Sequence, residues 1–215
     1  GRGVVLFAIE GAADPSRIAS YPHRWVKLGQ FGRFRRLAAD ASCRDIVFIG
    51  NLVRPALSGI WLDFATLRVL PRVAAAMRGG DDRLLTGVAK IFEIYGFRLL
   101  GAHEVAPEIL IAEGPIGRRN PSARDAADIE IGLALLDAIG RFDIGQAAVV
   151  IGGRVVAVEG AEGTDGMLAR IAEMRRTGRI RTAIGAGVLV KAAKPGQDHR
   201  FDLPAVGPQT VAGLA

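Results

Sequence analysis

Short apolar runs alternate along this chain with longer segments whose apolar residues recur every three or four positions. The runs are typical of buried strands and cover residues 4–9, 45–50, 97–100 and 187–191. The helical spacing covers residues 31–39, 64–77 and 81–95, and Pro71 is expected to break or kink the second of these helices. Strands that alternate with helices predict βαβ units and mainly parallel sheets.

The second half of the chain carries clearer start and stop signals. Ser122, followed by Asp125, predicts a helix N-cap, and this helix should stop near Gly140. Strands at 147–151 and 154–158 flank Gly152-Gly153, a two-residue hairpin signal, and a further helix is expected at 163–176. Residues 113–121 are rich in Gly, Pro and Arg and lack periodicity, which predicts a linker. We therefore expect two domains, at 1–112 and 122–215.

Composition agrees with an α/β protein and indicates where it works. The 215 residues are 50% hydrophobic and include 28 glycines, enough for a sizeable core with close helix–sheet packing. The single cysteine, Cys43, is interpreted as a buried thiol in a reducing compartment rather than as a nucleophile. The first residues form a strand-like run without a signal-peptide pattern, and no apolar stretch approaches the roughly 20 residues that span a bilayer. A cytoplasmic protein is expected.

Charge is divided unevenly between the two halves. The net charge is +7 over residues 1–100 and −1 over residues 101–215. The basic half could favour nucleic acid, an anionic membrane surface or an anionic ligand. The chain has neither zinc-finger nor helix-turn-helix spacing and no aromatic platform for single strands, so no nucleic-acid partner is expected.

Residues 191–207, KAAKPGQDHRFDLPAVG, hold the densest cluster of chemically useful side chains. Prolines and glycines at these intervals predict a shaped loop rather than a helix or strand. Lys191, Lys194 and Arg200 suit an anionic group such as phosphate. Asp198 and Asp202 are carboxylates that could bind a divalent metal or activate a water molecule.

A second motif, EGAEGTDGM at residues 159–167, follows a strand and opens a helix. The N–H groups of a helix N-terminus suit phosphate, which Thr164 could also contact while it caps the helix. Glu159, Glu162 and Asp165 offer oxygen ligands for Mg²⁺. Ordinary capping with an acidic first turn explains the same residues without any ligand.

Two further loops follow predicted strands of the first domain. GNLVRP at residues 50–55 could hold a ligand through Asn51 and Arg54, or form a turn with a solvated arginine. GAHEV at residues 101–105 places His103 either on a ligand or in an ordinary hydrogen bond. The sequence lacks a Cys/His cluster for zinc, a GxSxG serine motif, a P-loop and a GxGxxG fingerprint.

These motifs occur together in one order, and with RFDIGQAAVV at residues 141–150 the chain resembles the LpxI family over nearly its full length. Members are UDP-2,3-diacylglucosamine pyrophosphatases of lipid A biosynthesis in Gram-negative bacteria. The resemblance implies two α/β domains with the substrate chamber between them, and we expect the first to be Rossmann-like. It also implies hydrolysis of UDP-2,3-diacylglucosamine to UMP and 2,3-diacylglucosamine 1-phosphate (lipid X), with Mg²⁺ or Mn²⁺ as cofactor.

The family's essential aspartate lies in an R-x-D-L-P motif, which here places it at Asp202. We expect Asp202 to bind the metal or to act as the base that orients water, with Asp165 and Glu162 as further metal ligands. The remaining roles are inferred from chemistry: Lys191, Lys194, Arg200 and Thr164 would contact phosphate, and Asn51, Arg54 and His103 would close the chamber from the first domain.

The chain departs from the family pattern at both ends. Family members begin earlier, with a strand and a glycine-rich loop, and continue past the D-L-P motif, so we expect this chain to be less stable than a complete member. The alternative to an enzyme is a non-catalytic protein that binds the UDP-sugar or lipid X. A homodimer and weak peripheral contact with the inner membrane are also expected, and the face of Phe31, Phe34 and Leu37 either meets the membrane or covers the sheet.

Overall fold

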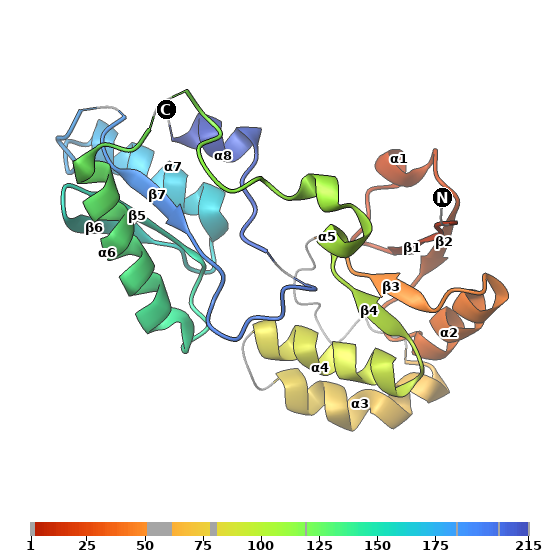
Figure 1. Ribbon diagram of the computed structural model, residues 1–215. Helices are drawn as coiled ribbons and strands as arrows, with labels where there is room; N and C mark the ends of the chain where they lie inside the picture. The colour runs from red at the N-terminus through yellow and green to blue at the C-terminus, as the bar shows by residue number, and fades with distance from the viewer. Residues whose placement is uncertain are drawn as a thin grey trace. The chain divides into compact units, whose positions relative to one another are not determined.

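In a computed structural model, the chain divides between Pro107 and Glu108 into two compact units (Figure 1). The structure describes residues 3–50, 62–77, 81–118, 120–183, 185–201 and 203–214. The predicted linker at 113–121 falls within the second unit.

The first unit mixes short strands with helices, and its strand pairs are parallel. Strand β1 pairs with β2, and β3 pairs with β4, both in parallel register, as the alternation of strands and helices predicts. The strands are β1 (Leu6–Ile9), β2 (His23–Val26), β3 (Asp45–Val47) and β4 (Arg98–Leu100). The helices are α1 (Pro15–Ile18), α2 (Phe31–Asp40), α3 (Phe64–Met77), α4 (Asp81–Ile94) and α5 (Ala102–Val105), and the 3₁₀ turn η2 (Pro107–Ile109) follows them.

Aromatic rings fill the space between α2, α4 and the strands of the first unit. The Phe34 ring lies 4.9 Å from that of Phe7 and 5.4 Å from that of Phe92. The Phe31 ring lies 5.2 Å from Phe92 and 5.0 Å from Tyr95, in edge-to-face geometry. The apolar face of α2 therefore packs inside this unit, which is the sheet-covering alternative to a membrane-facing helix.

A hydrogen-bonded junction holds the starts of α2 and α3 together. Asp63, just before α3, accepts from the backbone N–H of Thr66 at 2.8 Å and from that of Arg33 at 3.1 Å. The Thr66 hydroxyl accepts from the Phe31 N–H at 3.0 Å and donates to the Gly29 carbonyl. One carboxylate and one hydroxyl thus satisfy N–H groups that a helix start leaves open. Pro71 lies inside α3 without ending it.

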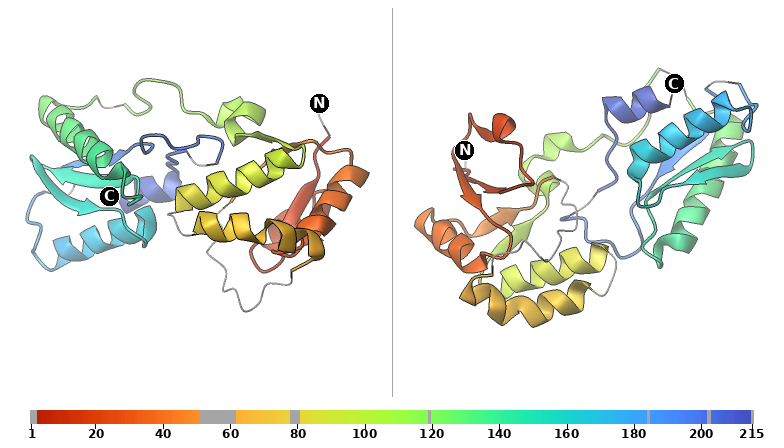
Figure 2. Two further views of the ribbon diagram at one scale, coloured as in Figure 1. Left: turned by 90° about the horizontal axis from the view of Figure 1, so that it is seen from below. Right: turned by 180° about the vertical axis from the view of Figure 1, so that it is seen from behind.

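The second unit is a three-stranded sheet with a long helix on each face (Figure 2). Its elements are α6 (Ala123–Gly140), β5 (Ala147–Ile151), β6 (Arg154–Val158), α7 (Gly163–Arg176), β7 (Val188–Lys191) and α8 (Pro208–Gly213). The strand order is β6-β5-β7 with every pair antiparallel, whereas mainly parallel sheets were expected. The hairpin at Gly152-Gly153 reverses the chain, and β7 returns along the other side of β5.

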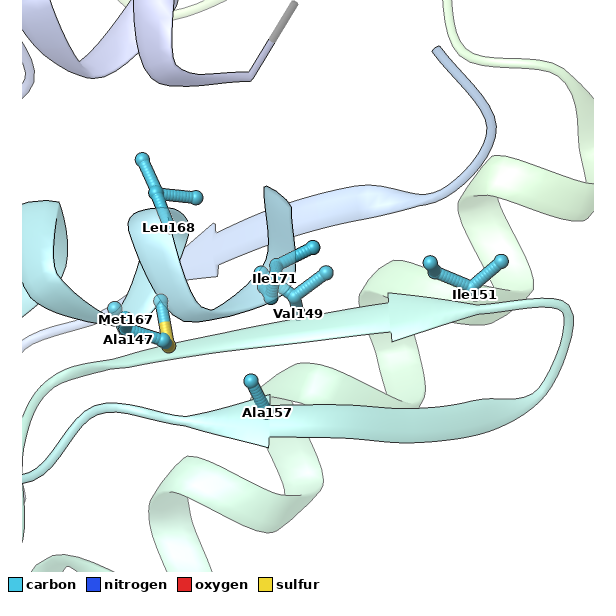
Figure 3. Close-up of a cluster of buried hydrophobic side chains, with 7 residues drawn as sticks. All are labelled: Ala147, Val149, Ile151, Ala157, Met167, Leu168 and Ile171. Carbon is cyan, nitrogen blue, oxygen red and sulfur yellow. The ribbon is translucent and has the colours of Figure 1, made fainter. Parts of the chain in front are cut away.

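Strand β5 lies at the centre of this unit and is buried along its whole length. Alternate side chains divide between its two faces. Ala147, Val149 and Ile151 pack with Met167, Leu168 and Ile171 of α7 (Figure 3). Ala148 packs toward α6 with Leu136 and Val190. This two-sided core fixes the ends of β6 and β7, from which the polar loops depart.

Among the described residues, none of the helices combines the length and apolarity needed to cross a lipid bilayer.

Candidate functional site

The first and second polar motifs meet within the second unit. Lys191, the last residue of β7, donates from Nζ to the hydroxyl of Thr164 at 2.9 Å, 27 residues away in sequence. The same ammonium donates to the carbonyl of Ala205 at 3.0 Å, which ties the far end of the 191–207 loop to β7. Thr164 lies in the first turn of α7. A lysine ammonium has three N–H donors, so one donor remains beyond these two contacts.

A buried carboxylate accepts a hydrogen bond from the Thr164 hydroxyl. Glu159 is 8% exposed and follows β6. One of its oxygens accepts from the Thr164 hydroxyl at 2.7 Å and the other accepts from the Gln146 N–H at 2.8 Å. Thr164 therefore accepts from Lys191 and donates to Glu159, which fixes the direction of its hydroxyl. We call Lys191, Thr164 and Glu159 the Lys191 chain.

Gly145 makes room for the buried end of the Lys191 chain. A Cβ at this position would lie 2.6 Å from the side chain and the carbonyl oxygen of Glu159. A larger residue would displace Glu159. The sequence pattern predicts Glu159 only as a candidate oxygen ligand for Mg²⁺. Its contacts in the structure instead hold Thr164 and the start of β5 in place.

Lys194 anchors the loop instead of standing free. Its Nζ forms an ion pair with Asp143, and both side chains are largely buried, at 17% and 22% exposed. The Lys194 N–H also donates to the Gln197 side chain at 2.8 Å. Asp143 lies in the RFDIGQAAVV motif but was not predicted as a site residue, because its contact with Lys194 spans 51 residues of the sequence. Since its charge is balanced, Lys194 contributes mainly by holding the loop against the turn that follows α6.

Arg200 forms a bidentate ion pair, called a fork below, with Asp198 two residues before it. Its Nε donates to Asp198 Oδ1 at 3.0 Å and its Nη2 donates to Oδ2 at 2.7 Å. The hydrogen bonds from Arg200 lower the pKa of Asp198 below the ordinary aspartate value, although partial burial opposes the shift. Asp198 therefore stays ionised and shapes the turn that leads to Asp202.

The start of α7 offers oxygen donors near Thr164. Glu162 is the N-cap residue, but its side chain does not cap the helix and instead accepts from Arg170 at 2.7 Å. Hydrogen bonds from its own backbone N–H and from Arg170 lower the pKa of Glu162. Asp165 is exposed in the first turn. Within the described ranges, no three His, Cys, Asp or Glu side chains converge on one point, so the ligand set of Asp202, Asp165 and Glu162 stays a prediction.

The other predicted site residues are not brought into this cluster. His103 lies in α5, directly after β4, in the first unit, and its Nδ1 is buried without a hydrogen-bond partner in the part of the chain that the structure describes. Asn51, Arg54 and Asp202 lie outside the described residues. The described part of the site is therefore a lysine ammonium and an oriented hydroxyl beside a helix N-terminus, which together suit a phosphate group.

Comparison with known proteins finds similarity along the whole chain. Residues 1–109 match the LpxI N-terminal domain and residues 112–215 match the LpxI C-terminal domain. The chain is also 42% identical, over 220 aligned positions, to the UDP-2,3-diacylglucosamine pyrophosphatase LpxI of Caulobacter vibrioides. That alignment covers all of this chain and 78% of the Caulobacter protein.

Proposed function

The chain belongs to the LpxI family, and from this premise we propose that it hydrolyses the diphosphate of UDP-2,3-diacylglucosamine. The identity of 42% to a relative that carries this activity in its name is the observation on which the proposal rests. The products are UMP and 2,3-diacylglucosamine 1-phosphate (lipid X). The Lys191 chain supports the assignment, because it presents a cation and a hydroxyl where a phosphate could bind.

Lys191 supplies positive charge to the diphosphate. Its two fixed contacts, to Thr164 and Ala205, hold the ammonium in place before substrate arrives. The remaining N–H donor would bind a phosphate oxygen whose negative charge increases during transfer. A preorganised donor of this kind lowers the barrier, because it does not have to reorient during the reaction.

Asp202 is proposed as the base for the attacking water. The water oxygen forms a bond to one phosphorus, its proton passes to the Asp202 carboxylate, and the bond from that phosphorus to the bridging oxygen breaks. Asp198 is a poor alternative because Arg200 already engages both of its oxygens.

A divalent cation, Mg²⁺ or Mn²⁺, is part of the proposal. Carboxylate oxygens suit these hard cations, and Asp165 would hold the metal, with Asp202 as a second ligand in the alternative to its role as the base. Glu162 could join them only by giving up its contact with Arg170. The metal would neutralise charge on the diphosphate.

UMP release from UDP-2,3-diacylglucosamine in the presence of Mg²⁺ tests the assignment. Asp202→Asn should lower kcat by about a hundredfold or more, the range expected for the loss of a general base. Lys191→Met should lower kcat by about tenfold to a hundredfold, as expected for one lost charge-stabilising donor. Asp137→Asn on the exposed face of α6 and Lys90→Met on the exposed face of α4 are matched controls. Absence of UMP release from the wild-type chain, with intact lipid X binding, would identify a non-catalytic binding protein instead.

The lipid product suggests where the protein works. An enzyme that releases a diacylated sugar phosphate in the cytoplasm gains from weak peripheral contact with the inner membrane.

A homodimer is proposed as the assembly state of the protein. Light scattering during size-exclusion chromatography measures the mass directly, and a monomer at working concentration would contradict the dimer.

A further inference from the structure

A groove of about 630 Å³ lies in the first unit, at the amino ends of β3 and β4. Its lining residues come from α2, from the turn that joins α2 to β3, and from the turn that joins α4 to β4. These helices and strands are labelled in Figure 1. Arg44 directly precedes β3 and Phe97 directly precedes β4. His103 follows β4, so it lies at the opposite, carboxyl end of this parallel pair. The function proposed above assigns no role to the groove.

Three arginines line this groove, which we call the Arg44 groove. They are Arg35 and Arg36 of α2 and Arg44 of the following turn. The Arg35 guanidinium stacks 4.3 Å above the ring of Tyr95. Among the described residues, none of the three forms an ion pair. The nearby carboxylate of Asp45 instead forms a fork with Arg98, at 2.9 and 2.7 Å.

These arginines could simply balance the partial negative charge at two helix C-termini. That explanation accounts for only part of their positive charge. Helices α2 and α4 both end at the groove, in turns that pass through left-handed Ser42 (φ 54°) and Gly96 (φ 86°). A helix C-terminus carries about half a negative charge, so the two ends together offset about one of the three positive charges. Asp40 and Glu93 lie near these ends but do not line the groove. About two positive charges remain.

We propose that the Arg44 groove binds a phosphate-bearing anion, either the headgroup of an anionic lipid or a free phosphorylated molecule. Arginine presents paired N–H donors that match two phosphate oxygens. Three guanidinium groups line the same groove, so several such pairs could bind one phosphate group. The Ser42 hydroxyl adds a neutral donor at the same wall. The stacking on Tyr95 limits the freedom of Arg35, which reduces the entropy lost on binding.

Cys43 provides a built-in reporter, because the single cysteine of the chain is half-buried in the wall of the groove rather than fully buried as the sequence predicts. Its rate of modification by the neutral reagent N-ethylmaleimide is measured with and without inorganic phosphate, with chloride at matched ionic strength as the comparison. Phosphate at about twice its Kd should slow the reaction about threefold by simple mass action. The double variant Arg36→Glu/Arg44→Glu should lose this protection. The control Arg17→Glu/Arg24→Glu has the same change in net charge outside the groove and should retain it.

Vesicles distinguish the two sources of phosphate. Protection of Cys43 by phosphatidylglycerol vesicles but not by phosphatidylcholine vesicles would identify a lipid headgroup, and protection by inorganic phosphate alone would identify a free ligand. Equal protection in the two double variants, or no protection by any of these probes, would overturn the proposal. UMP release is followed in parallel, and both variants should keep it, which separates a failure of this site from a failure of the proposed hydrolysis.

Discussion

Thr164 shows how one hydroxyl connects the two polar motifs of the second unit. It accepts from Lys191 and donates to Glu159, so its proton has one available direction. Glu159 is nearly buried, and its second oxygen is already occupied by the Gln146 N–H. The position of the Lys191 ammonium therefore depends on a carboxylate that does not contact it.

Thr164→Val removes the hydroxyl while it keeps the branched shape of the side chain. The change leaves one oxygen of buried Glu159 without its donor, which should reduce the free energy of unfolding by about 1–3 kcal/mol. It should also lower kcat for UMP release, because the Lys191 ammonium loses one of its two fixed contacts. Denaturant unfolding and steady-state kinetics measure the two effects. Thr177→Val, at an exposed hydroxyl that bonds only to α7 carbonyls, is the matched control, and equal effects of both variants would contradict this role.

The fork between Asp198 and Arg200 predicts a specific pH dependence of stability. The fork lowers the pKa of Asp198, so its contribution is fully present above the unfolded value of about 3.9 and is lost as the pH falls through the lower folded value. The melting temperatures of wild type and Asp198→Asn should therefore differ at neutral pH and converge under acid. The difference should be small, because both side chains are partly exposed. A difference that persists unchanged in acid would show that the fork is not its source.

At the residue scale, sequence reasoning found the reactive side chains but not their partners. Lys191, Lys194, Thr164 and Arg200 were recognisable because they stand in one loop and one helix start. Asp143 and the holding role of Glu159 were not, because each is defined by a contact across 51 or 13 positions of the chain. Long-range contacts of this kind arise from the packing of β5 between two helices and leave no local spacing signal.

At the scale of the elements, Asp128 links α6 to the β5–β6 hairpin. Its carboxylate is 2% exposed and accepts from the N–H groups of Gly152 and Gly153, at 2.7 and 2.6 Å. Both glycines adopt left-handed backbone conformations, and in this turn their N–H groups point toward α6. A single buried carboxylate thus holds the hairpin against α6.

Asp128→Ala should be among the most destabilising single changes in the second unit. It removes two charge-assisted hydrogen bonds and leaves two backbone N–H groups unpaired, so we expect a loss of about 3 kcal/mol in the free energy of unfolding. Chemical denaturation followed by circular dichroism measures it. Asp137→Ala, an exposed position on the same helix, should change stability by no more than about 0.5 kcal/mol. A comparable loss in both variants would point to helix propensity instead.

Local signals predicted most of these elements. The Ser122 cap and the hairpin at Gly152-Gly153 are confirmed, because caps and tight turns are set by a few neighbouring residues. Strand β2 and the short helices α1, α5 and α8 were missed. Their segments are too short to show a period, and β2 exists by pairing with β1 rather than by its own propensity. Strand β7 was predicted, but its antiparallel direction was not, because that direction is set by pairing with β5.

At the scale of the whole molecule, charge and packing divide along the same boundary. Residues 1–107 carry 15 Lys/Arg against 9 Asp/Glu, a net charge of +6, whereas residues 108–215 carry 13 of each and are neutral. The aromatic cluster of the first unit and the β5 core of the second are each built from residues of one unit. Each unit thus has its own source of stability.

This division predicts that damage to one unit stays in that unit. Asp128→Ala should raise hydrogen exchange in peptides from 108–215, and Asp63→Ala, which removes the junction between α2 and α3, should raise it in peptides from 1–107. The loss for Asp63→Ala should be about 1–2 kcal/mol, as for other helix caps. In the double variant the two losses should add, because the sites share no partner. Faster exchange throughout the chain in either single variant would instead show that both units unfold as one cooperative block.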